Sequence, residues 1–207
     1  MRSRGIESSI LNPPYINGYA DIVADITVQN NDDVILDINA NITNAEIDYS
    51  FLGFKKETGQ KGNIKTKVEI ADSKVKSVPS FSLSKDDFSL TGNMVMDKKG
   101  QIELIDIKDI KGPKTSASAK IEIVNSPKKK VKVNVSGHSY DLNTLFDKRE
   151  KAKKLSDKNK EDDNLKDVVD AEIFIAVNSL WTNQDTPIKN FAGSAVFKNG
   201  IGIDEVH

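Results

Sequence analysis

The sequence predicts an all-β protein whose strands form a long antiparallel meander sheet, curled into an open groove or gutter. Apolar and polar residues alternate along one segment after another, and no segment before residue 141 repeats apolar residues at helical spacing. Short polar turns join the segments, and connections of this kind join antiparallel neighbours. The sheet would have one apolar face and one polar face. A closed β-sandwich, in which the sheet covers its own apolar face, is the alternative.

The strands expected before residue 141 follow one another with little chain between them. In the first strand, Ile22 and Ile26 lie on one side and Asp25 lies on the other. The turns at 30–33 and 98–100 contain Asn, Asp or Gly, which tolerate the backbone angles of tight turns. The expected strands span residues 19–29, 34–43, 45–53, 62–71, 74–84, 87–97, 101–110, 115–125 and 130–137.

The strand at 101–110 breaks the alternation. Its apolar phase switches between Leu104 and Ile105. A β-bulge at this point would restore the alternation and bend the sheet. A strand that is covered on both faces is the alternative interpretation.

A short helix and a charged insertion are expected next. Asp141 would cap a helix from 142 to 146. Residues 147–167 are mostly charged and cannot bury a face, so they are expected to form a flexible insertion, with a docking helix as the alternative. The insertion interrupts one β architecture. We therefore expect an irregular segment at 1–17 and a single β domain at 18–205.

The β pattern returns after the insertion. Alternation resumes at Val169 and continues to Asn178. A last hairpin is expected near 190–198 and 201–205, because Asn199-Gly200 is a strong signal for a two-residue hairpin turn.

Composition excludes several function classes. The net charge of the 207-residue chain is −1 and aromatic residues make up 6%, so no nucleic-acid partner is expected. Without cysteine, the chain has neither disulfides nor thiolate metal sites. No apolar run approaches the ~20 residues of a membrane span, and the N-terminus lacks the apolar core of a signal peptide. Phosphate-binding glycine loops and zinc-binding helix motifs are also missing, so no cofactor or metal site is expected.

A single internal histidine is the only candidate for catalysis. His138 is flanked by Ser136, Ser139 and Asp141, so a nucleophile, a base and a carboxylate are close in sequence. A catalytic triad, however, requires convergence in space from supporting elements rather than crowding in one turn. We therefore interpret His138 as a loop residue, expect no catalytic residues, and predict that the protein is not an enzyme.

The apolar face then becomes the candidate functional surface. About ten strands spaced ~4.8 Å apart give a face several times larger than the ~300–600 Å² that a soluble monomer leaves exposed. Its inward positions are mainly aliphatic, and Thr66, Gly92 and Ser194 would leave room for an acyl chain. The proposed lining residues are Ile22, Ile26, Val28, Leu36, Ile38, Ile42, Val68, Ile70, Leu90, Met94, Ile121, Ile123, Val133, Val135, Ile173, Ile175 and Val177.

The order of these segments resembles the AsmA-like domain family, the AsmA, TamB and YhdP type of envelope protein. The resemblance covers roughly residues 18–203 and rests on degenerate strand patterns whose order is more specific than any one of them. One block is the Gly-His-Ser-Tyr-Asp-Leu-Asn-Thr-Leu segment after a strand, in which Tyr140 replaces a more usual aliphatic residue. The segments that carry the resemblance are 90–92, 98–100, 105–112, 115–119, 133–145 and 188–194.

The resemblance implies a function for the apolar face. Members of the family are inner-membrane-anchored proteins of Gram-negative bacteria, whose long curled sheet has an apolar groove. They are associated with phospholipid transport and outer-membrane biogenesis. It implies a periplasmic location, phospholipid acyl chains as ligands, and the remainder of a longer β-groove chain or another envelope protein as partner. This chain lacks the family's membrane helix and is shorter, so we expect it to be a fragment. A structural or protein-interaction β module without lipid is the alternative.

Overall fold

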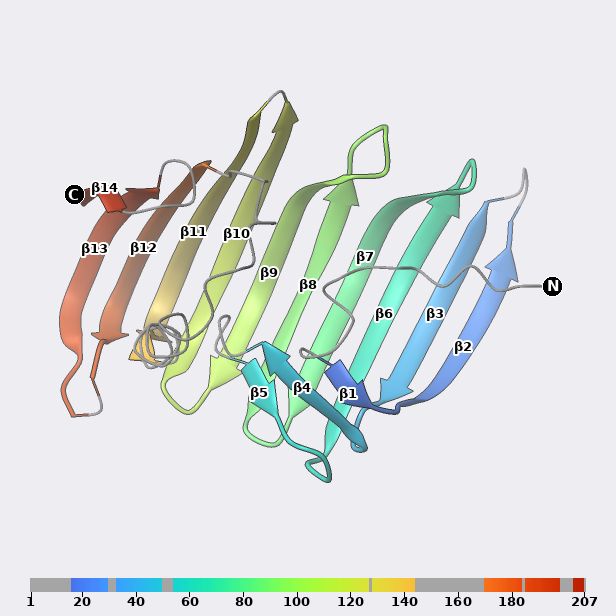
Figure 1. Ribbon diagram of the computed structural model, residues 1–207, viewed down its shortest axis with the longest axis horizontal. Helices are drawn as coiled ribbons and strands as arrows, with labels where there is room; N and C mark the ends of the chain where they lie inside the picture. Colours follow the sequence, from blue (N-terminus) through green and yellow to red (C-terminus); the bar gives the residue numbers. More distant parts are fainter. Residues whose placement is uncertain are drawn as a thin grey trace, which may run out of the picture.

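The computed structural model describes residues 16–29, 33–49, 54–126, 128–143, 170–183, 185–197 and 203–206. These residues form an all-β protein built on one large mixed sheet that is not closed into a barrel (Figure 1). Its eleven strands follow the order β14-β13-β12-β11-β10-β9-β8-β7-β6-β3-β2. The bounds are β2 (Asp21–Val28), β3 (Val34–Asn41), β6 (Gly62–Ala71), β7 (Lys74–Lys85), β8 (Phe88–Met96), β9 (Ile102–Gly112), β10 (Thr115–Ser126), β11 (Lys128–Asp141), β12 (Asp170–Trp181), β13 (Ile188–Phe197) and β14 (Ile203–Val206).

The expected all-antiparallel meander is wrong at one pair of strands. β11 and β12 are parallel, with Val133 opposite Ile173 and Val135 opposite Ile175. Parallel neighbours need a crossover of about a dozen residues or more. Residues 142–169 are long enough to return the chain to the end of the sheet where β11 began. The expected insertion at 147–167 lies wholly outside the described residues, as do residues 144–146 of the expected helix.

A second departure lies at the strand expected over 45–53. Its first part is β4 (Ala45–Tyr49), which leaves the large sheet and pairs with β1 (Ile16–Gly18) and β5 (Phe54–Lys56). This three-stranded sheet packs on the apolar face at the margin where β3 and β7 end and β6 and β8 begin. The buried residues of this junction, which form one core cluster, are Ala40, Ile42, Ala45, Ile47 and Phe54.

The expected bulge in β9 is present, but displaced. Relative to β8 the register shifts at Glu103, since Val95 faces Leu104 and Met96 faces Ile102. A second shift follows Ile107. These irregularities explain why the isoleucines of β9 are spaced by three, two and three residues and yet share one face. They are Ile102, Ile105, Ile107 and Ile110.

The apolar face as candidate functional site

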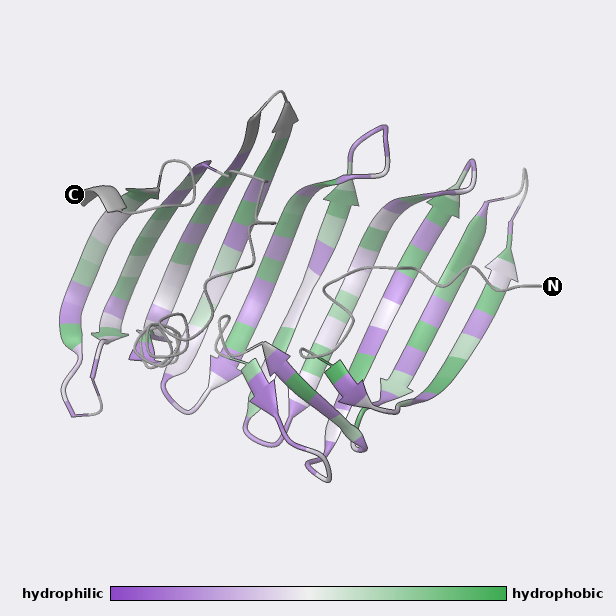
Figure 2. Ribbon diagram, in the orientation of Figure 1, coloured by the Kyte–Doolittle hydropathy of each residue, from purple (hydrophilic) through white to green (hydrophobic). Residues whose placement is uncertain are grey.

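The two faces of the large sheet differ in polarity, although Val95, Val124 and Phe174 are exposed on the more polar face. Apolar and polar residues alternate along most strands, which Figure 2 shows as green and purple bands. Because directly paired residues share a face, the ladder register traces apolar rows across the sheet. One such row, interrupted only where β7 bulges, is Ile26, Leu36, Val68, Val78, Met94, Ile105, Ile121, Val133, Ile173 and Ala195. The apolar face is therefore continuous from β2 to β13.

The structure brings nearly all of the predicted lining residues together on this face. Their ladder positions run from Ile22 on β2 to Val177 on β12. The exception is Ile42, which lies just beyond β3, is 3% exposed and packs under the small sheet. Ile42 therefore belongs to the junction core, and its placement on the open face was wrong.

Burial varies across the apolar face. Ile22, Ile26 and Val28 on β2 are 64–67% exposed. Val135 and Val177 are buried, whereas most of the remaining lining residues are half-buried. Among the described residues, the three-stranded sheet covers only the ends of β3, β6, β7 and β8. The described residues therefore leave much of the face uncovered.

Several residues of the apolar face were not predicted from the sequence. Phe81, Ile105 and Ile107 lie on it because bulges in β7 and β9 shift the apolar phase. The only signal in the sequence is an apolar spacing of three residues where two would continue a regular strand. A strand template must allow one bulge before Ile105 in β9 and two bulges between Val75 and Phe81 in β7 to place these residues.

Two of the three positions expected to leave room on the face do not do so. Ser194 pairs with Phe174, whereas its neighbour Gly193 pairs with Ile175, so Ser194 lies on the opposite face. Gly92 is on the apolar face, but the ring of Phe81 occupies the space beside it. Thr66 is on the apolar face as expected. Of these three small residues, only Thr66 is thus placed as expected to leave room on the apolar face.

The polar face carries ion pairs between strands and along them. Lys67 on β6 pairs with Asp37 on β3 at 3.4 Å. Lys120 pairs with Glu122 at 2.9 Å, and their hydrogen bond lowers the pKa of Glu122 and raises the pKa of Lys120. Such exposed pairs contribute little stability individually. Their main effect is to make this face hydrophilic.

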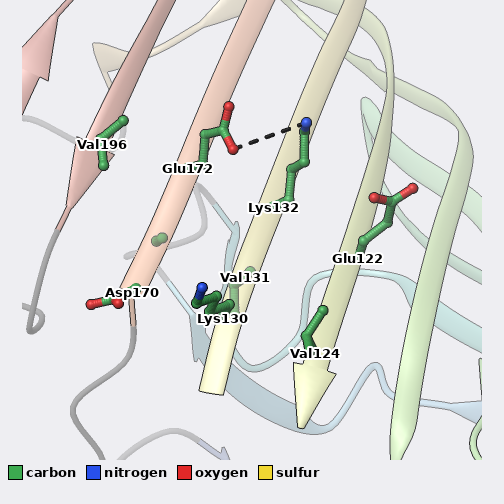
Figure 3. Close-up of a pocket in the computed structure, with 9 residues that line it drawn as sticks. Glu122, Val124, Lys130, Val131, Lys132, Asp170, Glu172 and Val196 are labelled. Atoms are coloured by element: carbon green, nitrogen blue, oxygen red, sulfur yellow. Dashed lines mark ion pairs between the residues drawn. The ribbon is translucent and has the colours of Figure 1, made fainter. Parts of the chain in front are cut away.

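Two hollows are lined mainly by residues of the polar face. One of about 370 Å³ is lined by Glu122, Lys132, Glu172 and Val196 together with the ends of β11 and β12 (Figure 3). In it Lys132 Nζ lies 3.9 Å from a carboxylate oxygen of Glu172. Another of about 560 Å³ crosses β3, β6 and β7. Both hollows are lined mainly by residues of the face opposite the apolar rows.

His138 lies within strand β11, so its expected position in a loop was wrong. It is exposed at a β-bulge in β11, where Ser139 faces Ser116 and Gly137 faces Ala117. The hydroxyl of Ser136 contacts the Ser118 hydroxyl at 3.3 Å. Within the described part of the chain, no group of His, Asp and Glu is arranged to hold a metal ion.

Known proteins supply no identification. Comparison of the chain with protein-family models, curated proteins and solved structures finds no match. No helix in the described ranges has the length and apolar character to cross a membrane. The AsmA-like resemblance therefore stays a prediction from the order of the strand patterns, and the function must be argued from the apolar face.

Proposed function

We propose that the chain is a non-enzymatic segment of an AsmA-like envelope protein, whose apolar sheet face is a groove surface for phospholipid acyl chains. The observation that carries this proposal is the continuity of the apolar face across the sheet from β2 to β13. A surface of this kind is much larger than the apolar patch of an ordinary soluble monomer. It needs an apolar occupant.

The pattern of burial supports an open face over a closed sandwich. A second sheet of the same chain would bury Ile38, Ile121 and Ile175 completely. All three are only half-buried, and so is Ile70. The small sheet covers one margin of the face, where it buries Ile42 and Ala45, and leaves the central rows without a described second layer. This arrangement favours a bound apolar ligand.

The energy available from such a surface is sufficient for lipid binding. Burying one methylene group is worth about 0.8 kcal/mol, so an acyl chain of about sixteen carbons could gain on the order of 10 kcal/mol before ordering costs. Binding would be non-directional along the face, because aliphatic side chains offer no preferred hydrogen-bond geometry. A ligand held in this way can slide, as transport between membranes requires. We place the protein in the periplasm, as part of an assembly anchored in the inner membrane.

Ile121→Asp is expected to abolish lipid binding while the fold survives. Ile121 lies in the middle of the apolar face, and a carboxylate there would have to be desolvated against the acyl chain. The measurement is native mass spectrometry of protein purified from an envelope-containing host, together with crosslinking to a photoactivatable phospholipid. The wild-type chain should retain lipid, and the variant should lose it.

Ser118→Asp is the matched control on the same strand. Ser118 faces Ser136 on the polar side, so the same charge is added without contact with the apolar face. This variant should bind lipid as the wild type does, and circular dichroism should show the same strand content in all three proteins. Absence of lipid from the wild-type protein, or equal crosslinking of both variants, would contradict the proposal.

A further inference from the structure

The edge strand β2 is exposed along its whole length. All eight of its residues are exposed, and Ile22, Val23, Ile26 and Val28 are each 64–67% exposed. It pairs with β3 on one side, and no strand among the described residues pairs with its other side. Natural proteins usually protect such an edge with lysine, proline, bulges or a covering element. β2 has neither lysine nor proline, and its pairing with β3 is regular throughout.

The backbone direction along β2 can be assigned from two hydrogen bonds. Gln29 N donates to Asp33 O at 2.8 Å. The backbone N–H and C=O groups of Gln29, and of every second residue before it, therefore point toward β3. Ile42 N donates to Gly62 O, toward β6, at 3.0 Å. The backbone groups along β3 therefore alternate between β6 and β2, in agreement with the assignment on β2. The N–H and C=O groups that point outward from the sheet therefore belong to the four apolar-face residues Ile22, Ala24, Ile26 and Val28.

The other face of this edge is acidic. Asp21 and Asp25 stand on the polar face of β2, and neither forms an ion pair with any described residue. Behind them, Asp37 on β3 is paired with Lys67. A strand added to β2 would therefore meet aliphatic side chains on one face and two aspartates on the other.

We propose that β2 binds an extended basic segment of another polypeptide as an additional strand, with apolar residues alternating with Lys or Arg. The outward backbone groups supply ladder hydrogen bonds, the aliphatic residues extend the apolar face, and the basic residues pair with Asp21 and Asp25. This inference does not depend on lipid binding, since it concerns the edge of the sheet and not the central rows.

A second copy of the same strand is a poorer partner. If two copies of β2 pair antiparallel about Asp25, the two Asp25 residues face each other. If they pair about Ala24, Asp25 of one copy lies diagonal to Asp21 and Asp25 of the other. Like charges at these positions are unfavourable. Charge complementarity therefore favours a basic segment.

The test uses three synthetic peptides, each with the eight-residue length of β2. In the first, valine and isoleucine alternate with lysine; in the second, glutamate replaces lysine; in the third, the residues of the first are scrambled to remove the alternation. Fluorescence anisotropy of labelled peptides measures binding to the full chain. The lysine peptide should bind about tenfold or more tightly than the other two, and added salt should weaken it.

Charge reversal at the edge should exchange this preference. The double variant Asp21→Lys/Asp25→Lys should bind the glutamate peptide and lose the lysine peptide. The matched control, Asp106→Lys/Asp109→Lys, makes the same change in net charge on the same face inside the sheet, and its preference should stay that of the wild type. Equal binding of the lysine and glutamate peptides to the wild type would overturn the proposal, as would equal effects of the two double variants.

Ala24→Pro tests the backbone hydrogen bonds separately. Proline removes an N–H that points outward, so the pairing with β3 should persist while peptide binding is lost. If this variant fails to fold, the charge-reversal pair decides the question. Dimerisation through β2 without binding of the lysine peptide would identify a second copy as the occupant and overturn the proposal.

Discussion

Replacing Lys56 with alanine is expected to lower the free energy of unfolding by about 2–5 kcal/mol, the range for emptying a large buried site. Lys56 ends β5 and is 0% exposed. Its Nζ donates hydrogen bonds to the carbonyl oxygens of Thr43 at 3.1 Å, Ala45 at 2.7 Å and Glu57 at 3.1 Å. It thereby joins β5 to the chain that enters β4. The substitution removes these bonds and the packing of the side-chain stem against Gly62.

Lys55→Ala is the matched control for this prediction. Lys55 is the neighbour of Lys56 on β5, but its side chain is 50% exposed and, within the described part of the chain, pairs with Glu57 alone, at 3.4 Å. Such a surface pair is worth about 0–1 kcal/mol. Urea unfolding of both variants measures the difference, and hydrogen exchange in β4 and β5 shows whether the small sheet opens first. Equal stability of the two variants would show that Lys56 does not fasten the small sheet.

The same residue predicts a dependence of stability on pH. Burial lowers the pKa of Lys56 below its ordinary value of 10.5, while Asp86 acts in the opposite direction. The folded state therefore binds fewer protons than the unfolded state between the lowered pKa and 10.5. The contribution of Lys56 to stability consequently rises with pH through this window. Lys56→Met, which keeps most of the side-chain volume, should abolish this rise in unfolding experiments at several pH values.

Strand positions were predictable because a period of two directly reflects a sheet with one apolar face. The strand expected over 62–71 matches β6, and 74–84 matches all but the last residue of β7. Strand direction was not predictable at β11 and β12. Alternation is the same for parallel and antiparallel strands, and only the path of the long connection distinguishes them. The departure of β4 was hidden for a similar reason, because Ala45 and Ile47 alternate with polar residues in either sheet.

The candidate site was predictable where strands are regular. Ile22 and Ile38 were placed on the face correctly because β2 and β3 pair without a bulge. Phe81 and Ile105 were missed because they follow β-bulges. A bulge reverses the face of the sheet on which every later side chain of the strand would otherwise lie. The importance of the edge strand was also hidden, since the exposure of Val23 depends on which strand ends the sheet.

Gly92→Ala is expected to destabilise the fold by about 1–3 kcal/mol, the usual cost of overfilling a packed site. A Cβ at Gly92 would lie 2.5 Å from the backbone oxygen of Asp106, 2.7 Å from Cζ of Phe81 and 3.1 Å from Cα of Ile107. The Phe81 ring could move away, but the Asp106 carbonyl belongs to the neighbouring strand β9. Local pairing of β8 with β9 would have to loosen.

Gly112→Ala on β9 is the control that separates crowding from the general effect of replacing a strand glycine. A Cβ there meets its nearest atom, Cδ2 of Phe88, at 3.5 Å, an ordinary contact. The free energy of unfolding of the Gly112→Ala variant should change little or rise by about 0.4–1 kcal/mol, because alanine restricts the conformations of the unfolded chain. Adding Phe81→Leu to Gly92→Ala should recover part of the lost stability, since it removes the contact with the ring and leaves the two contacts with the β9 backbone. Complete recovery, measured by urea unfolding, would show that the Phe81 ring is the only obstacle and that the sheet backbone accommodates a side chain at this position.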